Sequence, residues 1–98
     1  MNIQLTKEND TLIVNLEGRL DTTTAPELQK TLDDEIADHK KLIFDFEKLS
    51  YISSAGLRVL LAAQKTMNQQ GEMKILHVNE TIAEIFEVTG FSDILTIE

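Results

Sequence analysis

The chain has 98 residues, 42% of them hydrophobic, which is enough for one domain with a single core. Its formal net charge of −8, from 17 acidic and 9 basic residues, disfavours nucleic acid and anionic membrane surfaces as partners. The absence of cysteine excludes disulfides, thiolate metal sites and thiol nucleophiles, and with no basic leader or long apolar run we expect a cytoplasmic protein.

Two strands are predicted at the start of the chain. Apolar residues alternate with other residues over 3–5 and 12–16, the period-two pattern of strands with one buried face. Residues 8–10, Glu-Asn-Asp, are turn formers. We therefore expect a hairpin of strands near 2–7 and 11–17.

A helix is predicted over about residues 24–39. Thr24 and Glu27 have the Ser/Thr-x-x-Glu spacing of a capping box, and Pro26 fits the first turn of a helix. Apolar residues then recur every four positions, as on one face of a helix, at Leu28, Leu32 and Ile36.

A central strand and a long helix are predicted next. Residues 42–46 are apolar except for Asp45, which is typical of a short strand covered on both faces. The helix is expected to begin at residues 53–54 and to end at Gly71 as its C-cap. Its apolar face is expected to leave out Gln64.

A strand over 73–78, a helix and a short last strand over 94–97 complete the prediction. Asn79 is suited to cap the start of that helix, and Gly90 to end it. The order β-β-α-β-α-β-α-β implies right-handed crossovers between parallel strands. We therefore predict one α/β domain over residues 1–98, with helices packed on a mixed, partly parallel β-sheet.

Three serines, Ser50, Ser53 and Ser54, lie between the central strand and the long helix. In an open α/β sheet, sites lie outside the carboxyl ends of the strands, which is where residues 47–56 are expected. The simplest interpretation is that a serine hydroxyl caps the helix by accepting a backbone N–H, with Gly56 keeping the first turn free of side-chain bulk.

A nucleophilic serine is a second interpretation of the same segment. Ser54 and Gly56 match the second half of the Gly-x-Ser-x-Gly elbow, but position 52 is Ile. The only candidate bases are His39, at the far end of the first helix, and His77, which closes a strand without an evident orienting partner. A hydrolase is therefore disfavoured.

Sites that depend on acidic residues are also disfavoured. An aspartyl phosphate at Asp45, as in bacterial receiver domains, requires a pair of acidic residues closing the first strand, where this chain has Thr6-Lys7. No His, Asp and Glu cluster has metal-ligand spacing, and there is no phosphate-binding loop or dinucleotide glycine pattern. We expect no metal and no cofactor.

Phosphorylation of a serine is a fourth interpretation, and it has a physical mechanism. A phosphoserine adds about 1.5 to 2 negative charges. At a helix N-terminus the fold itself tolerates this anion, so the disturbance would fall on a partner docked over the helix start. A phosphate here would switch binding on or off.

Two segments of the chain resemble a known family. Residues 45–60, DFEKLSYISSAGLRVL, resemble the signature of the STAS domain family, as found in bacterial anti-sigma factor antagonists. Residues 18–21, Gly-Arg-Leu-Asp, followed by Thr22, Thr23 and Ala25, resemble the second block of that family. The predicted order of elements agrees with the family over essentially the full chain.

The resemblance implies a switch that performs no chemistry itself. In such families the unmodified antagonist binds an anti-sigma factor that is also a serine kinase, and this releases the sigma factor. The kinase phosphorylates one serine of the antagonist, which ends the interaction, and a metal-dependent serine phosphatase restores it.

The resemblance also implies which residues act. The typical loop of the family reads Asp-Ser-Ser/Thr-Gly-Leu, so the acceptor falls on Ser54, with Ser53 in place of the usual Asp and as the alternative acceptor. The expected partner-binding residues are Asp21, Thr22, Ser53, Ser54 and Gly56. The alternative function is an unphosphorylated adaptor, or a small-ligand-binding module, in a larger signalling or secretion-regulating complex.

Overall fold

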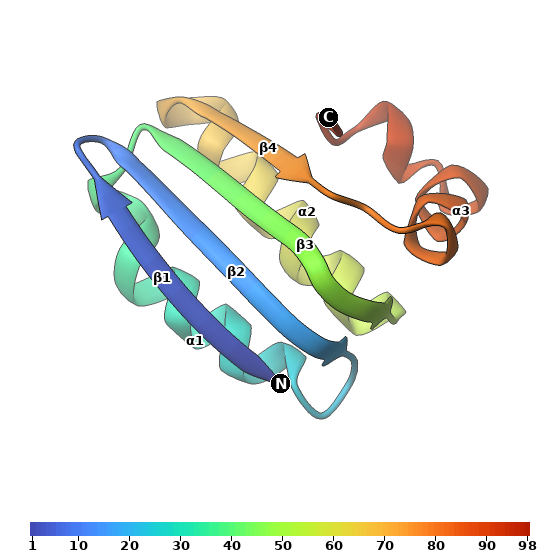
Figure 1. Cartoon of the computed structure of the whole chain (residues 1–98). Helices are drawn as coiled ribbons and strands as arrows, with labels where there is room; N and C mark the ends of the chain where they lie inside the picture. The colour runs from blue at the N-terminus through green and yellow to red at the C-terminus, as the bar shows by residue number, and fades with distance from the viewer.

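Four strands form one sheet in the order β1-β2-β3-β4 in the computed structural model, which describes residues 1–98 (Figure 1). β1 (Asn2–Glu8) pairs with β2 (Thr11–Leu20) in antiparallel fashion, as expected of a hairpin. β3 (Lys41–Ile52) pairs with β2, and β4 (Glu72–Leu76) with β3, both in parallel. The prediction of a mixed, partly parallel sheet is confirmed.

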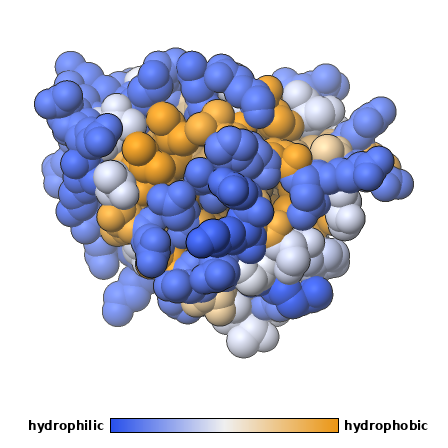
Figure 2. Space-filling view, viewed as in Figure 1, coloured by the Kyte–Doolittle hydropathy of each residue, from blue (hydrophilic) through white to orange (hydrophobic).

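The two crossover helices lie on one face of the sheet. α1 (Ala25–Glu35) connects β2 to β3, and α2 (Ser54–Gln70) connects β3 to β4. Figure 1 shows both helices behind the strands, with α3 (Glu80–Thr89) to the side of β4. No helix covers the face of the sheet that is turned toward the viewer, so this face is open. Figure 2 shows hydrophobic side chains gathered in the middle of the open face among hydrophilic ones.

The core lies between the sheet and the helices. Every second residue is buried over 12–16 of β2 and 42–46 of β3, and these side chains point to the helix layer. Full burial of one large apolar side chain contributes about 1.5–3 kcal/mol. The buried hydrophobic residues form one cluster of 22. Its largest members from the central strands are Leu12, Leu16, Leu20, Leu42, Phe44, Phe46, Leu49 and Ile52.

β3 is much longer than the predicted strand, which ended at residue 46. Asn15 pairs with Asp45, but Glu17 pairs with Lys48, so β3 contains one extra residue at this point. Such a bulge shifts the alternation of inward and outward residues, which conceals the strand in the sequence. As a result, residues 47–52 are strand and not loop, and only Ser53 separates β3 from α2.

The observed helix α1 differs at both ends from the helix predicted over residues 24–39. α1 ends at Glu35 and is followed by a 3-10 helix over Ile36–Asp38, so the α-helix does not extend to residue 39. Thr24 occupies the N-cap position, but its side chain does not cap the helix. Its hydroxyl donates to the Arg19 carbonyl at 2.8 Å and accepts the Asp21 N–H at 2.9 Å, so the predicted capping box is absent.

Two predictions about the long helix α2 are corrected by the structure. Gln64 is buried, although the predicted apolar face left it out, and its Nε2 donates to Asn68 Oδ1 at 2.8 Å. Gly71 does end the helix, but its backbone is extended and not left-handed. A Cβ at this position would collide with the carbonyl oxygen of Lys40, so close packing of two chain segments is the reason that only glycine fits.

The end of the chain contains less strand than predicted. Asn79 caps α3, since its Oδ1 accepts the Ile82 N–H at 2.8 Å, and Gly90 ends the helix with φ of 81°. Both of these predictions are confirmed. The predicted strand over 94–97, however, is reduced to a single parallel bridge between Ile97 and Ile75.

Candidate functional site

The carboxyl ends of β2 and β3 bring the two predicted site segments together. Leu20 pairs with Ile52, and the Ser53 N–H donates to the Leu20 carbonyl at 2.9 Å. Neighbouring strands lie about 4.8 Å apart. Asp21 and Ser53, each one residue beyond the last pair, are therefore adjacent, although they are distant in the sequence.

The two candidate acceptor serines differ in accessibility. Ser54 is exposed and is the first residue of α2. The Ser53 hydroxyl is buried and has no hydrogen-bond partner, so it does not cap α2 as the simplest interpretation predicted. Because no side chain caps α2, the N–H groups of its first turn have no side-chain acceptor. Ser54 is the accessible hydroxyl of the pair.

Asp21 is held in a tight turn that leads into α1. Its Oδ1 accepts the N–H groups of Thr23 at 3.0 Å and Thr24 at 3.2 Å. The Thr24 N–H in particular lowers the pKa of the Asp21 carboxyl, so this group is ionised at neutral pH. Asp21 is half-buried and Thr22 is exposed, and with Ser54 they form what we call the strand-end surface.

Gly56 lies beneath the strand-end surface and not on it. The residue is buried, and a Cβ added to it would lie 2.7 Å from both Leu20 Cγ and Ile52 Cγ1. Glycine therefore lets the first turn of α2 pack directly on the ends of β2 and β3. This packing holds the start of α2 against the strand ends, close to the turn that contains Asp21. That is a different contribution from the partner contact expected of Gly56.

Three residues that were not predicted to act at the site, Arg19, Ser50 and Tyr51, hold the strand ends together. The Arg19 guanidinium lies 4.4 Å from the centroid of the Tyr51 ring, and its Nε is 3.7 Å from Asp21 Oδ2. The Ser50 hydroxyl donates to the Gly18 carbonyl at 2.9 Å. Arg19 and Tyr51 are paired across β2 and β3, but this pairing depends on the bulge and could not be read from either segment alone.

Neither histidine can act as a base for Ser54. His77 follows β4, whose last residue, Leu76, pairs with Asp45. From Asp45, β3 continues to Ile52, roughly 20 Å further along the sheet. His39 precedes the opposite end of β3 and is buried, with its Nδ1 2.9 Å from the Glu35 carbonyl oxygen. The arrangement does not support a serine hydrolase.

The structure does reveal a cluster of titratable residues at the bulge. His77 Nδ1 lies 3.0 Å from Asp45 Oδ1, so the prediction that His77 lacks an orienting partner is wrong. Asp45, Glu47 and His77 each contribute one possible ligand atom, and these three atoms lie within 4.8 Å of one another. The prediction that no such cluster has metal-ligand spacing is also wrong, because the β3–β4 register joins residues that are distant in the sequence.

The His77–Asp45 pair predicts a measurable titration. The Asp45 carboxylate raises the pKa of His77 above its ordinary 6.5, and we expect Asp45→Asn to lower it toward that value. Because the folded pKa is above the unfolded one, the pair stabilises the fold fully below about pH 6.5, and this contribution is lost as pH rises through the folded pKa. An NMR titration of the His77 ring in both proteins measures the change, and equal values would show that the pair does not form.

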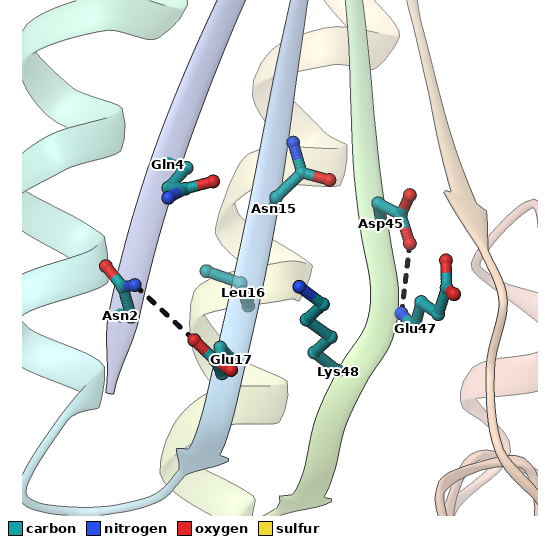
Figure 3. A pocket seen from close by; sticks show the side chains of 8 residues that line it. All are labelled: Asn2, Gln4, Asn15, Leu16, Glu17, Asp45, Glu47 and Lys48. Atoms are coloured by element: carbon teal, nitrogen blue, oxygen red, sulfur yellow. Dashed lines mark hydrogen bonds between the residues drawn. The ribbon is translucent and has the colours of Figure 1, made fainter.

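A polar hollow on the open face of the sheet is small. Its volume is about 110 Å³, well below the roughly 300–1,000 Å³ typical of small-molecule sites. A second depression, of about 300 Å³, is lined by residues of α3 alone. The residues that line the first are shown in Figure 3: Asn2, Gln4, Asn15, Leu16, Glu17, Asp45, Glu47 and Lys48. Neither depression includes the strand-end surface.

Comparison with known proteins finds relatives over the whole chain. The family model for the STAS domain matches residues 2–98. The anti-sigma-B factor antagonist of Staphylococcus aureus is 33% identical over 99 residues, and the match covers 99% of this chain and 92% of that protein. No helix of the structure has the length and apolar character needed to cross a membrane.

Solved structures share the fold. The unphosphorylated form of the anti-sigma factor antagonist SpoIIAA has a TM-score of 0.79 at 21% identity, covering 99% of this chain and 87% of that chain. The phosphorylated form of SpoIIAA, a Bacillus cell fate determinant, has a TM-score of 0.78 at 21% identity. The match covers 99% of this chain and 91% of that chain. An anti-sigma factor antagonist from Mycobacterium paratuberculosis has a TM-score of 0.89 at 18% identity. The match covers 98% of this chain and 83% of that chain.

Proposed function

Because the chain belongs to the STAS domain family, we propose that it is an anti-sigma factor antagonist that binds its anti-sigma factor through the strand-end surface. The S. aureus relative, which is named as such an antagonist, matches nearly the whole chain. The observation that carries the proposal at the level of residues is the exposed Ser54 hydroxyl at the start of α2, at the same strand ends as the ionised Asp21. In this proposal the chain acts by binding, and the distance of both histidines from Ser54 argues against a serine hydrolase at this surface.

Phosphorylation of Ser54 is the proposed switch. The hydroxyl lies at the uncapped N-terminus of α2, where backbone N–H groups and the helix dipole favour an anion. Arg58 is exposed one turn further along the same helix, at the i+4 spacing that allows it to pair with a phosphate. The folded chain can therefore accept the charge, while a partner docked over Ser54 would have to accommodate about two added negative charges.

The proposed partners follow from this switch. An anti-sigma factor that is also a serine kinase would bind the unmodified chain and phosphorylate it, and a metal-dependent serine phosphatase would remove the phosphate. Asp21 offers a fixed negative charge to a cationic group of the kinase. Because these reactions regulate a sigma factor, we place the protein in the cytoplasm.

Incubation with ATP and the candidate partner kinase tests the proposal. Intact-mass spectrometry should show one added phosphate, and peptide mapping of residues 49–58 should place it on Ser54. Ser54→Ala should remove the modification, whereas Ser92→Ala, at an exposed serine near the end of the chain, should retain it. A phosphate on Ser53 would move the acceptor by one residue. A tight complex without any phosphate would favour the unphosphorylated adaptor.

A further inference from the structure

The cluster of Asp45, Glu47 and His77 lies apart from the strand-end surface, at the bulge of β3. Asp45 is on the open face of the sheet, opposite Leu76 of β4. His77 follows directly, with a φ of 59°, a left-handed conformation that is uncommon for residues other than glycine. The register of the parallel strands and this turn of the backbone together bring the imidazole to the carboxylate.

The cluster offers three different side chains that are common metal ligands. The separation of 3.0 Å between His77 Nδ1 and Asp45 Oδ1 is close to the roughly 3.0–3.4 Å that separates adjacent ligands around a metal with bonds of about 2.1 Å. The Glu47 carboxylate is within 4.8 Å of both, on an exposed side chain that can rotate closer. A metal would replace the proton that His77 and Asp45 share.

The surroundings of the cluster leave room for a cation. Figure 3 shows the side chains of Asp45 and Glu47 on the side of β3 that faces away from β2, while Lys48 extends between β2 and β3. Lys48 forms no ion pair within 4.0 Å with either carboxylate, so it does not occupy the position of the cation. The side chain of His77 is 56% exposed and that of Asp45 22%, so a hydrated ion has access to both.

The Asp45 carboxylate is already oriented for coordination. Its Oδ1 accepts the Glu47 N–H at 2.9 Å, a backbone contact that fixes the carboxylate within the bulge. Hydrogen bonds of this kind orient ligands in metal sites.

We propose that Asp45, Glu47 and His77 bind one divalent transition-metal ion, which joins β3 to the turn after β4. One imidazole nitrogen with two carboxylates suits ions such as Zn²⁺, Ni²⁺ or Fe²⁺ and disfavours Mg²⁺ and Ca²⁺, which prefer oxygen ligands alone. Water completes the coordination on the open face of the sheet. The site is independent of Ser54 and of the proposed partner.

Calorimetric titration of the untagged protein with ZnCl₂ tests the site. We expect one Zn²⁺ per chain, with affinity reduced at least about tenfold by His77→Gln and by the double variant Asp45→Asn/Glu47→Gln. The matched control, Asp33→Asn/Asp34→Asn, removes two exposed carboxylates from α1 and should bind Zn²⁺ as the wild type does. MgCl₂ at the same concentration should not compete.

Amide NMR spectra of the same samples locate the ion and show that each variant is folded. Zn²⁺ should shift the resonances of residues 45–47 and 76–78. The proposal is overturned if no stoichiometric binding occurs at millimolar Zn²⁺, if His77→Gln binds as tightly as the wild type, or if the shifts centre elsewhere. Equal competition by Mg²⁺ would also overturn it, because the imidazole would then not be a ligand.

Discussion

A Ser54→Asp variant is expected to bind the anti-sigma factor about 100-fold more weakly than the wild-type chain, or worse. The new carboxylate would be at the first position of α2, at the strand ends where the ionised Asp21 also lies, on the surface that we propose contacts the partner. Burying an added carboxylate that has no partner in an interface costs several kcal/mol, and each 1.4 kcal/mol is a factor of ten in affinity. Surface plasmon resonance or calorimetry with the purified partner measures the change.

Two control variants separate this effect from unfolding and from net charge. Ser54→Ala should bind normally and resist the kinase. Gln69→Glu adds the same charge to an exposed position near the other end of α2, about 20 Å away, and should also bind normally. The thermal stability of Ser54→Asp should not fall, because an acidic residue at a helix N-terminus is favourable by about 0.3–1 kcal/mol. Tight binding by folded Ser54→Asp would refute gating by charge.

Gly71→Ala is expected to be the most damaging single methyl addition, lowering the free energy of unfolding by about 3 kcal/mol. The new Cβ would collide with the Lys40 carbonyl oxygen, which accepts the Glu72 N–H at 3.0 Å. The Lys40 N–H in turn donates to the Asp10 carbonyl at 2.9 Å. Backbone that is held from both sides cannot move aside cheaply, so we expect the melting temperature to fall by roughly 10 °C or more.

Gly90→Ala is the matched control for that variant. Gly90 has φ of 81°, but a Cβ there would meet no atom within 4 Å. Only the left-handed backbone is then penalised, at about 1 kcal/mol. Chemical denaturation of both variants compares the two costs. If Gly71→Ala were no more destabilising than Gly90→Ala, the close approach of Lys40 to the start of β4 would be incorrect.

The sequence by itself determined the features that depend on neighbouring residues. Alternating apolar residues predicted the first two strands and the residues of β2 that face the core. The caps of α3 at Asn79 and Gly90 were predicted because the relevant hydrogen bond and the left-handed turn are both local. The residues near Asp21 and Ser54 that resemble the STAS family were also visible as two short segments.

The hydrogen bonds of the Thr24 and Ser53 hydroxyls could not be predicted from neighbouring residues. Thr24 and Ser53 have the residue type and place of N-caps, yet neither side chain caps its helix. The Thr24 hydroxyl bonds to Arg19 and Asp21, and the Ser53 hydroxyl is enclosed. Which partner a hydroxyl meets depends on how the strand ends pack, and that packing is not encoded in the few residues around it.

Only the tertiary structure decided where Ser54, Asp21 and the cluster around His77 lie. The bulge in β3 extends the strand to Ile52 and sets the pairing that places Asp21 beside the start of α2. The register of β3 against β4 brings His77 to Asp45. A local pattern predicts which residues form strands, but the residues that face one another are determined by how the strands align, a property of the whole sheet and of no single segment.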